Sequence, residues 1–129
     1  MYQEIQRRQG QGDFRALLLL AYENCCALSD CDVAATLEAA HIVPYSGAAA
    51  QHVQNGILLR ADLHTLFDMK LLMIHPESLT VEIDSSLQGT SYGWLSGTRL
   101  KEPKRPEWRP STKALLHRAH GELSLHVEI

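Results

Sequence analysis

The densest apolar run of the chain covers residues 13–24, with the sequence DFRALLLLAYEN. Its apolar side chains are close enough together for a largely buried helix. Asp13 stands where a carboxylate can cap the first turn of such a helix. We therefore expect a helix here that supports the core.

Two shorter apolar runs follow, at residues 36–43 and 57–59. The first ends before Pro44 and a loop of small residues, so it predicts a strand that closes on a loop, and the second predicts its partner strand. Asp62 then occupies the position of a helix N-cap, and LHTLFDM after it predicts a helix of about two turns. The order is strand, strand and helix.

The rest of the chain alternates between β-prone runs and turn signals. LLMIH and LTVEI are separated by PES, which predicts a hairpin, and LQGTSYGWLSG is rich in turn residues. Three prolines exclude regular structure across residues 103–110. A last helix is expected from Ser111, whose hydroxyl can cap it. The fold class is therefore α+β, in one small domain with an N-terminal core helix, a strand–strand–helix unit, an additional hairpin and a C-terminal helix.

Length and composition agree with one globular domain over residues 1–129. The chain is 45% hydrophobic and 21% charged, which is ordinary for such a domain. Its longest apolar run, residues 16–22, is too short to cross a bilayer. The N-terminus has no apolar secretory segment, so a cytoplasmic location is expected. The sequence also has no glycine-rich phosphate loop, and an ATP-driven mechanism is not predicted.

The three cysteines, Cys25, Cys26 and Cys31, are odd in number and lie close together, which does not resemble a disulfide framework. Reduced thiols are expected. Cys26 and Cys31 could form half of a zinc knuckle, but no second pair follows to complete four ligands. Small buried hydrophobic side chains near a turn are the alternative interpretation.

Charge is unevenly distributed along the chain. The formal net charge is −3, yet residues 99–118 hold seven basic side chains and two acidic ones. Such segregation would let a basic surface follow a phosphate backbone, whereas the alternative is a solvated, proline-broken loop. The candidate nucleic-acid-binding residues of this segment are Arg99, Lys101, Lys104, Arg105 and Arg109.

Four polar residues have the types and spacing of a metal-assisted hydrolytic site. His64 and Asp68 are four residues apart on the predicted short helix, so both side chains leave one face and can share a divalent ion. His41, at the end of the first strand, can accept a proton from water. Asn55 can donate and accept together, and so tie the loop after the first strand to the second strand.

The motifs LEAAHIVPYS and NGILLRADLHTLFD resemble the HNH endonuclease family, whose ββα-metal finger would lie at about residues 36–70 here. The resemblance implies cleavage of DNA phosphodiester bonds with a divalent ion such as Mg²⁺, Mn²⁺, Ni²⁺ or Zn²⁺. By motif, His41 is the general base and Asn55 the organiser of the loop. His64 belongs to the catalytic and metal-binding sets, and Asp68 is the last metal ligand.

The chain departs from many relatives at Ala40, where they place an aspartate or histidine ligand directly before the base. Glu38 could compensate, because alternation puts it on the same strand face as Ala40. Asp62 could also serve as a ligand, although capping explains it more simply. Arg60 is a candidate phosphate contact beside the start of the helix, and a structural salt bridge is its alternative.

Two other functions remain open at this stage. One is a catalytically silent module that binds nucleic acid or protein on the same scaffold. The other is a toxin or defence effector whose nuclease is restrained by an inhibitory or regulatory partner. A homodimer would ease paired cuts in duplex DNA.

Overall fold

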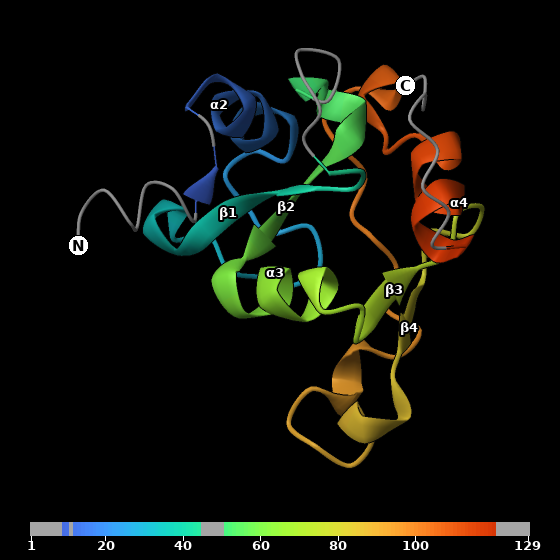
Figure 1. The fold of residues 1–129 in the computed structure, drawn as a ribbon. Coiled ribbons are helices and arrows are strands. Elements are labelled where there is room, and N and C mark those ends of the chain that lie inside the picture. The colour runs from blue at the N-terminus through green and yellow to red at the C-terminus, as the bar shows by residue number, and fades with distance from the viewer. Residues whose placement is uncertain (1–8, 11, 45–50, 121–129) are drawn as a thin grey trace.

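The computed structural model describes residues 9–10, 12–44 and 51–120. In these residues three α-helices accompany two antiparallel two-stranded sheets, which confirms the α+β class. Figure 1 shows the first sheet between α2 and α3, with α4 beside the second sheet. The elements in chain order are α2 (Gly12–Ala21), β1 (Leu37–His41), β2 (Gly56–Arg60), α3 (Ala61–Asp68), β3 (Leu72–Ile74), β4 (Val81–Ile83) and α4 (Thr112–His120).

Helix α2 is shorter than predicted. It begins at Gly12, so Asp13 lies in the first turn and the prediction that Asp13 caps the helix is wrong. A carboxylate in the first turn still interacts favourably with the helix dipole. The helix ends at Ala21, and Glu23 and Asn24 then have φ values of 53° and 60°. These left-handed residues turn the chain, which ends the helix before residue 24.

Strands β1 and β2 form the predicted hairpin, with Ala40 opposite Ile57 and His41 opposite Gly56. The first four residues of each strand are buried. Burial on both faces explains why the strands appear in the sequence as continuous apolar runs. Strand β1 starts one residue later than predicted, because Thr36 belongs to a 3₁₀ turn.

Gly56 allows α2 to lie directly on this hairpin. A Cβ atom at Gly56 would lie 2.5 Å from the Phe14 ring and 2.7 Å from the Leu18 side chain, much closer than real carbon atoms pack. Phe14 and Leu18 are both buried on the inner face of α2. The absence of a side chain at Gly56 is therefore what brings the helix and the end of β1 together.

Helix α3 follows β2 without a loop. Arg60 occupies its N-cap position without a side-chain capping bond, and Asp62 lies in the first turn. The predicted N-cap role of Asp62 is therefore wrong. The buried face of α3 includes Leu63 and Phe67, which hold the helix against the hairpin.

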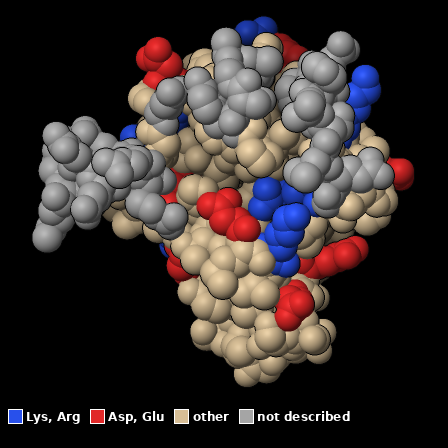
Figure 2. All heavy atoms as spheres, in the orientation of Figure 1, with Lys and Arg blue, Asp and Glu red and all other residues tan. Residues whose placement is uncertain are grey.

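The second hairpin has the predicted pairing, with Leu72 opposite Ile83. After β4 the chain forms a projecting lobe below α3 (Figure 1), whose residues 85–98 contain no charged side chain. On the face drawn in Figure 2 this lobe is mostly tan, the colour of residues other than Lys, Arg, Asp and Glu. The prolines beyond it interrupt regular structure as expected, apart from a 3₁₀ turn at Pro106–Trp108. The predicted cap of α4 is confirmed, because the Ala114 N–H donates to Ser111 Oγ at 3.2 Å.

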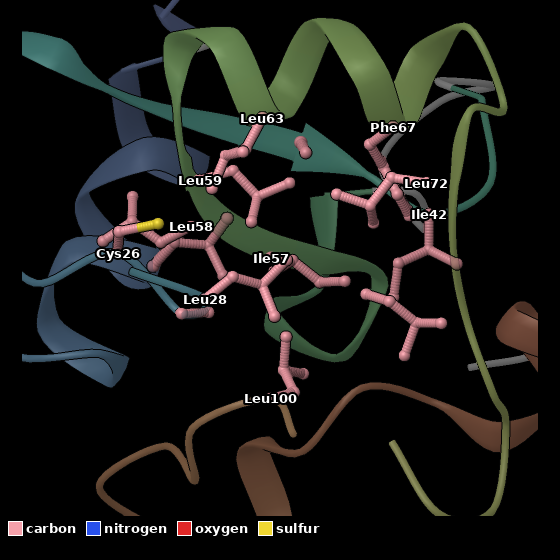
Figure 3. Close-up of a cluster of buried hydrophobic side chains, with 14 of the residues drawn as sticks. Cys26, Leu28, Ile42, Ile57, Leu58, Leu59, Leu63, Phe67, Leu72 and Leu100 are labelled. Carbon is pink, nitrogen blue, oxygen red and sulfur yellow. The ribbon is translucent and has the colours of Figure 1, made fainter. Parts of the chain in front are cut away.

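The core is centred on β2 and α3, as Figure 3 shows. Cys26 is fully buried within it, and its Sγ accepts the Arg60 N–H at 3.3 Å. Cys31 instead lies beside Thr36 at the edge. All three cysteines are free, and the part of the chain that the structure describes has no group of three potential metal-binding side chains. Likewise, no helix in the described residues has the length and apolar character that a bilayer crossing requires. The labelled core residues are Cys26, Leu28, Ile42, Ile57, Leu58, Leu59, Leu63, Phe67, Leu72 and Leu100.

Candidate metal-assisted active site

The fold brings together three predicted site residues from two elements. His41 ends β1, whereas His64 and Asp68 lie on α3. The charges of His64 and Asp68 both affect the pKa of His41, so the three side chains are within electrostatic reach of one another. Helix α3 contacts both strands of the hairpin. This packing positions His64 and Asp68 relative to His41.

Asn55 holds the chain immediately after β1. Its Oδ1 accepts the Val43 N–H at 3.0 Å and its Nδ2 donates to the Val43 carbonyl at 3.1 Å. The Asn55 carbonyl also accepts the Ile42 N–H at 2.9 Å. Asn55 is only 1% exposed. Removal of its amide would therefore leave buried polar groups without hydrogen-bond partners. The double hydrogen bond expected for its amide is present.

The His64 ring lies between two carboxylates. Its Nδ1 is 2.7 Å from Glu38 Oε1, and its Nε2 is 3.2 Å from Asp68 Oδ2. Burial lowers the pKa of His64, but the hydrogen bonds to Asp68 and Glu38 outweigh it and raise the pKa overall. Glu38 is buried with the ring, whereas the Asp68 side chain is 49% exposed. The Nε2 edge of the ring thus lies beside the more exposed of the two carboxylates.

The spacing of His64 and Asp68 fits two ligands of one divalent ion. Two ligand atoms that each lie about 2.1 Å from an octahedral ion are about 3 Å apart, close to the observed separation of His64 Nε2 and Asp68 Oδ2, 3.2 Å. Glu38 occupies the other ring nitrogen, as carboxylates commonly do behind metal-binding histidines. The geometry therefore favours Glu38 as the residue that orients His64 over Glu38 as a ligand. Ala40, on the same strand face, supplies no ligand atom.

The ring of His41 packs against a core side chain of helix α2. Its ring stacks on Phe14, with 4.3 Å between the ring centroids and an interplanar angle of 12°. Burial lowers the pKa of His41, and a hydrogen bond with Gln51 opposes this only in part. The lowered pKa favours the neutral imidazole, which is the form that can accept a proton.

Asp62 and Arg60 form an ion pair with each other. Arg60 Nε and Nη2 donate to the two oxygens of Asp62 at 2.7 and 3.0 Å, and the Tyr92 hydroxyl donates to Asp62 Oδ2 at 2.8 Å. The Arg60 hydrogen bond lowers the pKa of Asp62. These contacts match the structural alternatives for both residues, so we do not include Asp62 in the metal site or Arg60 among phosphate contacts.

Three arginines of the basic segment pair with its two carboxylates. Glu102 pairs with Arg99 at 3.3 Å and with Arg109 at 2.6 Å. Arg105 pairs with Glu107 at 3.0 Å. These three arginines are therefore less available to phosphate than the sequence alone suggests.

Lys101 and Lys104 of the segment have other surroundings. Lys101 Nζ donates to the Ser29 carbonyl at 2.7 Å and lies 3.3 Å from Asp30 Oδ1. Lys104 lines a shallow groove on α2 that also contains Glu23. Neither arrangement resembles a row of unpaired cations along a phosphate backbone.

Three further residues contribute to the site without having been predicted from the sequence. Phe14 and Gln51 contact His41. Arg118 donates a hydrogen bond to the Phe67 carbonyl near the end of α3 and interacts electrostatically with Asp68. Phe14 carries no sequence signal beyond membership of a buried helix. Arg118 could only be counted among the basic residues of its segment.

Comparison with known families now adds to this geometry. Residues 26–75 match the model of a family described as HNH endonuclease. This match confirms the resemblance of the two motifs to the HNH endonuclease family. The match contains β1, β2, α3 and β3 but neither α2 nor α4. No curated protein matches the chain.

Proposed function

We propose that the protein is a metal-dependent endonuclease that hydrolyses DNA phosphodiester bonds. The observation that carries the proposal is the His64 ring, which Glu38 holds with Nε2 toward Asp68 and within electrostatic reach of His41. The family match supports a nuclease, and DNA is the substrate class that the resemblance of the motifs implies.

Each residue has a defined part in this proposal. His64 and Asp68 would hold the divalent ion, which when bound would neutralise charge on the phosphate and the leaving oxygen. His41 would accept the proton of the attacking water, because burial lowers its pKa and so favours the neutral ring. Asn55 acts as a positioning residue, since it fixes the chain that follows His41.

The test uses the purified full chain and supercoiled plasmid DNA. Cleavage should stop with EDTA and return with added Mg²⁺, Mn²⁺, Ni²⁺ or Zn²⁺, and Asp68→Ala should lose it. Asp84→Ala is the matched control, because Asp84 is exposed and, among the described residues, its carboxylate accepts hydrogen bonds from Ser86 alone. Cleavage that ignores the chelator, or that survives in Asp68→Ala, would remove the metal from the mechanism.

A catalytically silent binding module is the second candidate. Ala40 leaves the site with one ligand fewer than many relatives have, which favours this alternative. Absence of bound metal and of nicking, with a retained DNA mobility shift, would support it. A cytoplasmic location, a homodimer and an inhibitory partner stay predictions of the sequence.

A further inference from the structure

Arg118 connects α4 to the candidate site from outside the family match. Its Nη1 donates to the Ile42 carbonyl at 2.9 Å, and its Nη2 donates to the Phe67 carbonyl. The guanidinium carbon lies 3.7 Å from the centroid of the Phe67 ring. Three contacts from two elements therefore fix the position of this side chain.

Both accepting carbonyls are next to residues of the site. Ile42 directly follows His41, and Phe67 directly precedes Asp68. Arg118 thus lies where the end of β1 and the end of α3 come together. In the orientation of Figure 1, basic atoms adjoin acidic atoms in the middle of the face between β1, α3 and α4, as Figure 2 shows.

The arginines of the described residues fall into two groups, and Arg118 belongs with Arg15, whose guanidinium also donates to backbone carbonyls. Arg60, Arg99, Arg105 and Arg109 each have a carboxylate within ion-pair distance. In the described part of the chain Arg118 has no such partner, and its anchors are neutral carbonyls.

Burial adds a cost to this arrangement. It lowers the pKa of Arg118, and the charge of Asp68 opposes the shift only in part. Arg118 Nε is also buried without a hydrogen-bond partner in the described residues. Burying a cation without a carboxylate is costly for folding, and the two carbonyl hydrogen bonds and the Phe67 ring offset part of this cost.

We propose that Arg118 binds a phosphate group of the substrate at the candidate site. The inference rests on the proposed function, because the phosphate would be that of the DNA backbone. Guanidinium groups recognise phosphate through several parallel N–H donors. Arg118 is held in place before any ligand binds, so it can contact the phosphate without ordering a free side chain.

The experiment compares Arg118→Gln and Arg118→Lys with Lys113→Gln. Lys113 lies on the same helix and is exposed, so its replacement makes the same change in net charge away from the site. Circular dichroism first confirms that each variant folds. Three quantities are then measured: Mn²⁺ affinity by electron paramagnetic resonance, affinity of the Mn²⁺-loaded protein for inorganic phosphate by calorimetry, and kcat and KM for a labelled DNA duplex.

Arg118→Gln should weaken phosphate binding about tenfold or more, as expected for loss of a hydrogen bond to a charged group. Its Mn²⁺ affinity should stay the same or rise, because a neighbouring cation has been removed. Arg118→Lys should restore part of the phosphate affinity, and Lys113→Gln should match the wild type.

Two results would overturn the proposal. One is an Mn²⁺-loaded wild type that binds no phosphate, or an Arg118→Gln variant that binds it as well as the wild type. The other is an equal loss of Mn²⁺ and phosphate affinity in Arg118→Gln, which would mean that Arg118 only holds the chain ends. A wild type that binds Mn²⁺ and phosphate but cleaves no DNA would contradict the proposed function alone, since the phosphate titration still judges Arg118.

Discussion

The hairpin–helix unit and the basic segment use polar residues in opposite ways. In the unit, His64 connects Glu38 on β1 to Asp68 on its own helix. In the segment, Glu102 pairs with Arg99 and Arg109, which are only a few positions away in the sequence. The first arrangement brings together side chains that can act in one reaction, whereas the second pairs opposite charges on the surface. A count of basic residues therefore says little until their nearby carboxylates are placed.

The energetic consequence differs as well. Exposed ion pairs contribute about 0–1 kcal/mol each. By contrast, a buried polar group that loses its partner costs about 1–3 kcal/mol. Substitutions in the two regions should therefore have very different effects.

The largest effect is expected from the general base. His41→Ala should reduce plasmid cleavage by about 10²- to 10⁴-fold, because no group would remain to take the proton of water. His120→Ala is the control, since His120 is an exposed histidine on α4. Gel assays of nicking, with thermal unfolding to verify the fold, measure both variants. Full activity in folded His41→Ala would eliminate the proposed base.

A large stability effect is expected at Asn55. Asn55→Ala should lower the free energy of unfolding by about 1–3 kcal/mol, because both backbone groups of Val43 lose their partner. Gln54→Ala removes a neighbouring amide whose bond to the Glu107 carbonyl is exposed, and should change stability by only about 0.5 kcal/mol. Urea unfolding measures the difference. Equal losses at the two positions would refute a special role for the Asn55 amide.

A moderate effect is expected in the pH dependence of cleavage. Activity should rise with pH and level off with an apparent pKa below the ordinary histidine value of about 6.5, because burial lowers the pKa of His41. Below that pH the ring is protonated and cannot accept a proton. Phe14→Ala should move the midpoint upward, since water would then reach the ring. A midpoint above 6.5 in the wild type would contradict the assignment.

The smallest effect is expected in the basic segment. The double variant Arg99→Gln with Arg109→Gln should leave the salt dependence of DNA binding almost unchanged, because both arginines already pair with Glu102. If both contacted phosphate, the slope of log affinity against log salt would fall by about 2. Fluorescence anisotropy at several salt concentrations distinguishes the two results. The larger fall in slope would support the prediction that Arg99 and Arg109 contact DNA phosphates.

The sequence predicted the hairpin–helix unit well because its signals are local. Apolar runs located β1 and β2, and the spacing of His64 and Asp68 placed both side chains on one helix face. Element ends were less accurate. Asp13 and Asp62 both resembled caps, yet each lies inside its helix, because a carboxylate is favourable at either position.

The parts of the site that sequence could not predict depend on contacts between distant segments. Phe14 reaches His41 only because Gly56 leaves space between α2 and the hairpin. Glu38 was a candidate for metal binding on the basis of strand alternation. Alternation gives a face but does not say which ring nitrogen of His64 the carboxylate meets.

The contact of Phe14 with Gly56 and His41 also bears on how such a domain can be moved between proteins. The ring that supports His41 lies twelve positions before the first residue of the family match. A graft limited to the matched segment would carry the recognisable motif but leave one face of the imidazole bare to water. A segment that could be transferred with the support of His41 intact must therefore include α2 and be longer than the matched residues.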